Sequence, residues 1–152
     1  RLHLSAYGEP PQPRSPSRQL YKGCHAGASR GGFNGRVLVR SGAQLTNAHQ
    51  TNRNLLLSEA ALVDTKPQLE IHADDVRCTH GATIGRLDDD ALFYLRARGI
   101  GLEEARDLLV GAFANEVIAR VLAEALRASY QALVGGRLAA LAATGVSDRR
   151  NP

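Results

Sequence analysis

The 152-residue sequence contains no tryptophan and no methionine, and it has only two cysteines, Cys24 and Cys78. Two cysteines cannot form the disulfide framework of a small secreted domain. The sequence has no run of about 18 apolar residues, the minimum for a membrane-spanning helix, and its N-terminus lacks the apolar core of a signal peptide. We therefore expect a cytoplasmic protein without a membrane partner. Because the chain opens at Arg1 without a methionine, we also expect it to be a piece of a longer gene product.

Clusters of basic residues are also missing. The formal net charge is +4, and residues 1–87 carry eleven Lys or Arg against six Asp or Glu, but these charges are spread along the chain. A nucleic-acid groove needs clustered Lys and Arg to neutralise phosphates. The sequence therefore argues against nucleic acid as a partner.

The glycine-rich stretch of residues 29–36 lacks the Gly-Lys-Ser/Thr ending of a phosphate-binding loop. We therefore expect no ATP binding by this chain. Glycine adopts positive φ angles without a steric penalty, so we expect the glycines of this stretch to lie in turns.

The composition and the hydrophobic periodicity of the sequence change along the chain. Residues 1–17 hold four of the six prolines and are expected to be irregular. Residues 18–87 show short segments in which apolar residues alternate, such as Val37 with Val39, and such alternation is typical of strands. Residues 88–143 show helical periodicity, and residues 144–152 are expected to form a flexible tail.

Two architectures fit the strand region. Short strands without helices between them can stack as rungs of a parallel solenoid, or they can pair as an antiparallel sandwich. The helical region is clearer at its start, where Asp88, Asp89 and Asp90 supply an N-cap and negative charge for a helix that ends near Gly99. A later helix is expected to break at Gly135-Gly136.

Cys78 and His80 are the pair of residues with the clearest chemistry. Residues two apart in a strand project to the same side, about 6.6 Å apart from the rise per residue. Thiolate and imidazole are good ligands for iron or zinc, but two ligands do not complete a tetrahedral site. The alternative is that Cys78 is a buried core residue beside Val76. The neighbouring Asp74-Asp75 pair is expected to form a solvated turn rather than a metal site.

Several segments together resemble one protein family, and they keep its order and spacing from about residue 18 to about residue 118. The most specific stretch, residues 67–85, reads PQLEIHADDVRCTHGATIG, and it is preceded by NLLLS at residues 54–58 and followed by LFYL at residues 92–95. The sequence resembles the C-terminal part of the SufB/SufD family of the SUF iron–sulfur cluster assembly system. Within that family, the run from His80 to Thr83 is similar to the SufD type.

The resemblance implies a right-handed parallel β-helix followed by a small helical domain. It implies a scaffold subunit rather than an enzyme, partnered by SufB through the end of the β-helix and by the ATPase SufC through the C-terminal helices. It also implies a transient iron–sulfur cluster, bound jointly with a partner and held on this chain by Cys78 and His80. The residues expected to contact SufC lie on the first helix and are Asp89, Asp90, Phe93, Tyr94 and Arg98.

Two other functions stay open at this point. The first is an adaptor of the same family that binds SufC, carries no cluster ligand and forms a homodimer. The second is an enzyme on a β-solenoid, either an acyltransferase with His80 as base or a polysaccharide lyase. The hexapeptide repeats of the first enzyme and the convergent acidic and basic residues of the second are not visible in the sequence.

Overall fold

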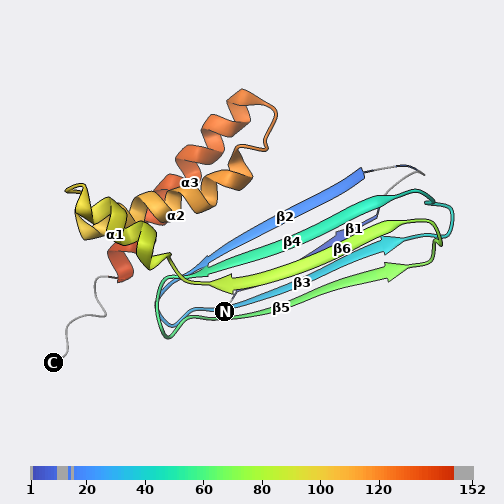
Figure 1. Ribbon diagram of the computed structural model, residues 1–152, viewed down its shortest axis with the longest axis horizontal. Coiled ribbons are helices and arrows are strands. Elements are labelled where there is room, and N and C mark those ends of the chain that lie inside the picture. Colours follow the sequence, from blue (N-terminus) through green and yellow to red (C-terminus); the bar gives the residue numbers. More distant parts are fainter. Residues whose placement is uncertain (1, 10–13, 15, 146–152) are drawn as a thin grey trace.

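The computed structural model describes residues 2–9, 14 and 16–145. In this part of the chain, strands come first and helices follow (Figure 1). The strands are β1 (Leu2–Gly8), β2 (Pro16–His25), β3 (Arg30–Val39), β4 (Asn47–Leu56), β5 (Leu62–Ile71) and β6 (Arg77–Gly85). The helices are α1 (Asp89–Ala97), α2 (Leu102–Ile118) and α3 (Glu124–Gly145).

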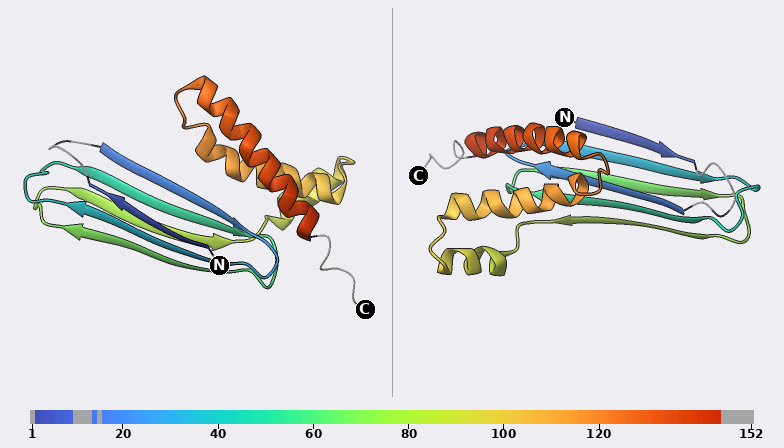
Figure 2. Two further views of the ribbon diagram at one scale, coloured as in Figure 1. Left: turned by 180° about the vertical axis from the view of Figure 1, so that it is seen from behind. Right: turned by 90° about the horizontal axis from the view of Figure 1, so that it is seen from above.

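Consecutive strands alternate between two three-stranded sheets, in the orders β1-β3-β5 and β2-β4-β6. Each of the described strand pairs is parallel, so the antiparallel sandwich is wrong. Figures 1 and 2 show the two sheets lying face to face as a long flat slab, with the helices at one end. A mainly β fold with C-terminal helices is thus confirmed, while the right-handed β-helix stays a prediction.

The core lies between the two sheets. Alternate residues of β3 point into this space, and Val37 and Val39 are almost fully buried there, as their period-two spacing predicts. The cluster around them also contains Ala43, Ala48 and Ala73, with Leu69, Val76 and Cys78 packed against it. Burying apolar surface at about 25 cal/mol per Å² makes this small cluster a main source of stability for the sheets.

The space between the sheets also holds a row of polar side chains. Gln50, Asn52 and Asn54 occupy alternate positions of β4, and each is at most 5% exposed. Asn54 donates to the Asn52 side-chain oxygen at 2.7 Å, and the Asn54 oxygen lies 3.3 Å from a ring nitrogen of His25. Because buried amides are costly without partners, these bonds fix how the side chains can be arranged.

Two expectations for the N-terminal part are wrong. Residues 2–8 form β1, which pairs in parallel with β3, so this part of the segment is not irregular, and residues 10–13 lie outside the described residues. Pro16 is the first residue of β2, a position where its missing N–H costs little. The glycines at 31, 32 and 35 do not form turns but lie within β3, and the positive-φ glycines of the described chain are Gly27 and Gly99.

The start of the helical region agrees with the sequence. The Asp88 side chain accepts hydrogen bonds from the backbone N–H groups of Asp90 and Ala91, and Gly99 has a φ of 88° just after the end of α1. The expected break at Gly135-Gly136 is wrong, since α3 continues to Gly145. Residues 146–152 of the expected tail lie outside the described residues. None of the described helices is long and apolar enough to cross a membrane.

A buried cation joins the helices to the sheets. The ammonium group of Lys22, on β2, donates to the backbone oxygen of Phe113 at 2.8 Å and to the Glu116 carboxylate. It also lies 4.1 Å from the centre of the Phe113 ring, and the Lys22 side chain is only 5% exposed. This single lysine therefore anchors α2 on the sheet that contains β2.

The anchor should be sensitive to acid. The hydrogen bond from Lys22 holds the pKa of Glu116 below its usual range. A carboxylate with a lowered folded-state pKa contributes stability that is present above its unfolded pKa, about 4.3, and is lost as the pH falls through the folded pKa. We expect Glu116→Gln to lower stability near neutral pH but to flatten its dependence on pH between 5 and 3. Thermal unfolding across that range measures this, with Glu59→Gln as control; parallel pH profiles for wild type and Glu116→Gln would contradict it.

Candidate functional site

Cys78 and His80 lie on β6 and point into the space between the sheets. In the register of β4 with β6, Cys78 is paired with Ala48 and His80 with Gln50. Ala48 and Gln50 are each 1% exposed, so this face of β4 is the inner one. Paired residues of parallel strands project to the same side, so the two sequence-predicted residues share the inner face of their sheet.

The two side chains differ in exposure because β6 is an edge strand. Cys78 is half-buried against the core cluster, whereas His80 is exposed. Other residues on the inner side of the last two strands are exposed as well, with Ile71 at 42% and Ile84 at 51%. No further strand of the described chain covers β5 or β6. Cys78 and His80 thus lie at an open end of the stacked strands, which we call the β5–β6 end.

Cys78 and His80 at the β5–β6 end could supply at most two ligands to a metal. Among the described residues no three His, Cys, Asp or Glu side chains come together as a metal site would require. Thiolate and imidazole suit iron, but a four-coordinate site needs two further ligands. The arrangement can therefore hold iron only together with sulfide or with ligands from a second protein.

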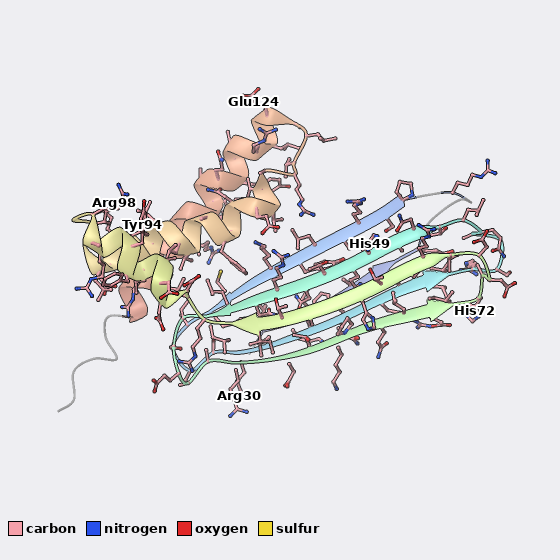
Figure 3. The ribbon with its side chains drawn as sticks, viewed as in Figure 1. Arg30, His49, His72, Tyr94, Arg98 and Glu124 are labelled. Carbon is pink, nitrogen blue, oxygen red and sulfur yellow. The ribbon has the colours of Figure 1, made fainter. Side chains whose placement is uncertain are left out.

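The other candidate residues lie elsewhere. Cys24 is paired with Leu55 in the register of β2 with β4, far along the strand from Cys78. Burial raises the pKa of the Cys24 thiol, although the Lys22 charge acts in the opposite direction, and a raised pKa disfavours the thiolate that binds metals. Asp74 and Asp75 are exposed in a bend between β5 and β6, as expected. His49 lies on the outer face of β4, where its Nδ1 is 2.6 Å from the Thr79 hydroxyl (Figure 3).

The exposed side of α1 carries the residues that the sequence points to for a partner. Phe93 is 73% exposed and Tyr94 is 55% exposed, which is unusual for two adjacent aromatic residues. The Arg98 guanidinium lies 4.6 Å from the centre of the Tyr94 ring, and the two side chains point outward together (Figure 3). Asp89 and Asp90 are exposed in the first turn of the same helix.

Gln50, which lies beside His80 in the sheet, is not among the site residues expected from the sequence. Gln50 is 1% exposed, and its side-chain oxygen has no hydrogen-bond partner among the described residues. A signal was present in the sequence, because Ala48, Gln50, Asn52 and Asn54 alternate with exposed or partly exposed residues in the manner of a strand face. From the sequence alone, polar residues on such a face are predicted to point to solvent, and only the fold shows that they point inward.

Comparison with known families identifies the chain. The model for "SUF system FeS cluster assembly, SufBD core domain" matches residues 9–113. The chain belongs to the SufBD family. The resemblance seen in residues 54–95 is therefore confirmed.

Relatives of this SufBD chain cover most of it. The iron-sulfur cluster assembly protein SufD of Escherichia coli (strain K12) is 48% identical over 122 residues, which are 80% of this chain and 29% of that protein. The SufBD family protein slr0076 of Synechocystis is 45% identical over 125 residues, 82% of this chain and 28% of that protein. The chloroplastic protein ABCI7 of Arabidopsis thaliana is 53% identical over 108 residues, 70% of this chain and 22% of that protein. The SufBD chain thus spans less than a third of the length of these relatives.

Proposed function

We propose that this SufBD chain is the C-terminal part of a SufD-type scaffold subunit on which iron–sulfur clusters are assembled for delivery. The observation that carries the proposal is that Cys78 and His80 face the same way at the open β5–β6 end. The cluster is the cargo of the scaffold and is bound transiently. Cys78 and His80 would supply two of its ligands, and a second subunit would complete the coordination.

The second subunit is proposed to be SufB, docked on the β5–β6 end. An edge strand presents unpaired backbone N–H and C=O groups, and a partner strand can pair with them. The apolar side chains exposed at this end, including Ile71 and Ile84, would be covered at the same time. The finer fold, a right-handed parallel β-helix, is proposed with it, because alternation of consecutive strands between parallel sheets is the connectivity such a helix requires.

The third subunit is proposed to be the ATPase SufC, docked on α1. The exposed Phe93 and Tyr94 supply apolar area, and aromatic and arginine residues are enriched among residues that dominate binding energy. Asp89, Asp90 and Arg98 surround them with charge of both signs. ATP hydrolysis in SufC would drive a rigid-body movement of the helices that reaches the sheets through the Lys22 anchor.

The docking surface on α1 can be tested by charge reversal. We expect the variant Asp89→Lys, Asp90→Lys and Phe93→Ala, made in the full-length protein, to reduce capture of SufC at least about tenfold, since truncation of a central aromatic alone costs about 2 kcal/mol or more. Pull-down and titration with purified SufC measure the loss. A matched control outside α1 changes two exposed leucines to alanine, Leu122 in the connection between α2 and α3 and Leu126 on α3. Undiminished capture by the α1 variant would reject this surface.

The scaffold is distinguished from a cluster-free adaptor by His80. In cells that also produce SufB and SufC, the full-length His80→Ala protein should still form the complex and lose its iron and sulfide. An unchanged cluster content would favour the adaptor, and a homodimer in place of a mixed complex would favour it further. A scaffold without turnover of its own and a cytoplasmic location stay predictions that accompany this proposal.

A further inference from the structure

A buried amide oxygen lies unpaired beside the proposed cluster ligand. Gln50 is 1% exposed, its Nε2 donates to the side-chain oxygen of Gln19 at 3.0 Å, and its Oε1 has no hydrogen-bond partner among the described residues. A buried acceptor left without a donor costs free energy. A donor that approaches this oxygen would remove that cost.

The orientation of the Gln50 amide limits the directions from which a donor can approach its oxygen. Gln19 lies on β2, and β4 lies between β2 and β6. The nitrogen of a primary amide and its oxygen point in different directions from the same carbon, so a nitrogen held towards β2 turns the oxygen away from β2. On the β6 side, the residue in register with Gln50 is His80, one strand spacing of about 4.8 Å away.

The opposite sheet brings no side-chain donor to this place. Gln50 Oε1 would lie 2.7 Å from a Cβ on Gly35, so the missing side chain of Gly35 makes room for the amide oxygen. The residue in register with Gly35 on β5 is Pro67, which has no N–H to donate. His80 is exposed, and its ring makes no hydrogen bond within the described part of the chain. The ring is thus free to turn towards the oxygen.

We propose that Gln50 is a positioning residue for His80, in that its amide oxygen accepts a hydrogen bond from one ring N–H of His80. The inference rests on the proposed role of His80 as a cluster ligand. A hydrogen bond to one ring nitrogen selects the tautomer and fixes the ring, and the other nitrogen is then offered to iron with its lone pair free. The side chains of Gln19, Gln50 and His80 would then be linked by hydrogen bonds. These bonds would hold the His80 ring at the β5–β6 end in one orientation, fixed from the interior.

The test is the tautomer of the His80 ring, measured by nitrogen NMR on the full-length protein labelled with 15N-histidine. The His80 signal is assigned by its absence from His80→Ala. In the wild type we expect one neutral tautomer to dominate. Gln50→Met removes the acceptor at nearly constant length and should change the tautomer ratio about fivefold, the effect of one ordinary hydrogen bond. Gln50→Glu keeps an acceptor oxygen and should preserve the dominant tautomer.

Asn52→Leu is the matched control, since Asn52 is equally buried on β4 but lies in register with Ala82. This substitution should disturb packing without changing the tautomer ratio of the His80 ring. If the wild-type His80 ring has the tautomer ratio of free histidine, the inference is overturned, even if no Gln50 variant folds. The inference is also overturned if the His80 ring has the same tautomer ratio in Gln50→Met as in the wild type. The NMR result is independent of cluster content, so a His80→Ala complex that keeps its clusters would reject the proposed function and leave the hydrogen bond as measured.

Discussion

The His80→Ala protein should copurify with SufB and SufC in normal yield while its content of iron and acid-labile sulfide falls at least about tenfold. Loss of tuning contacts around a metal ligand already costs roughly 10- to 100-fold in affinity, and loss of a ligand itself should cost no less. Assembly should survive because the His80 side chain is exposed and lies outside the core cluster. We therefore expect the substitution to affect only the binding of the iron–sulfur cluster.

The control for this experiment is His49→Ala. His49 lies on β4 beside the same part of β6, where it bonds Thr79, but it points out of the opposite face of the sheet (Figure 3). Its loss should leave iron and sulfide unchanged. Equal losses from both variants would mean that the sheet, and not the imidazole of His80, is required. Intact clusters in both would reject a ligand role for His80.

Gly31→Ala should destabilise the sheets by about 1–3 kcal/mol, the usual cost of overpacking a filled interior. A Cβ on Gly31 would lie 2.3 Å from Cε1 and 2.9 Å from Nδ1 of His25. The His25 ring cannot easily retreat, because it is buried and lies 3.3 Å from the Asn54 side-chain oxygen. Thermal or urea unfolding of the full-length protein measures the loss.

A double-mutant cycle separates the clash from other effects of alanine. In a His25→Ala background, the same Gly31→Ala change should cost little, or should stabilise by lowering the entropy of the unfolded chain. Gly81→Ala is the strand control, because nothing lies within 4 Å of a Cβ built there. A Gly31→Ala protein as stable as Gly81→Ala, or a cost of Gly31→Ala that is unchanged without the His25 ring, would contradict the clash.

Local patterns predicted several elements well. The spacing of Val37 and Val39 placed both in the core, because side chains of a strand alternate between its faces whatever the fold. The same rule placed Cys78 and His80 on one face of β6. The cap at Asp88 and the ending at Gly99 were correct because helix ends are satisfied by neighbouring residues in the chain. Each of these features depends on interactions only a few residues apart.

Features that depend on distant contacts could not be predicted. β1 forms because β3 offers it a parallel partner, and nothing within residues 1–17 shows that partner. α3 runs through Gly135 and Gly136 because its packing against α2 and its many alanines and leucines offset about 1 kcal/mol of lost propensity for each glycine. The glycines of β3 leave space for His25 and Gln50, which approach from other strands, rather than forming turns.

The sequence by itself determined the family, the division into strands followed by helices, and the shared direction of Cys78 and His80, because motif order and side-chain alternation are properties of the chain. Only the tertiary structure decided that this shared direction is inward, that the pair lies at an open end of the stack, and that Gln50 lies beside His80 with its oxygen unpaired. The physical reason is that alternation fixes which residues share a face, whereas the strands stacked on either side decide what that face meets.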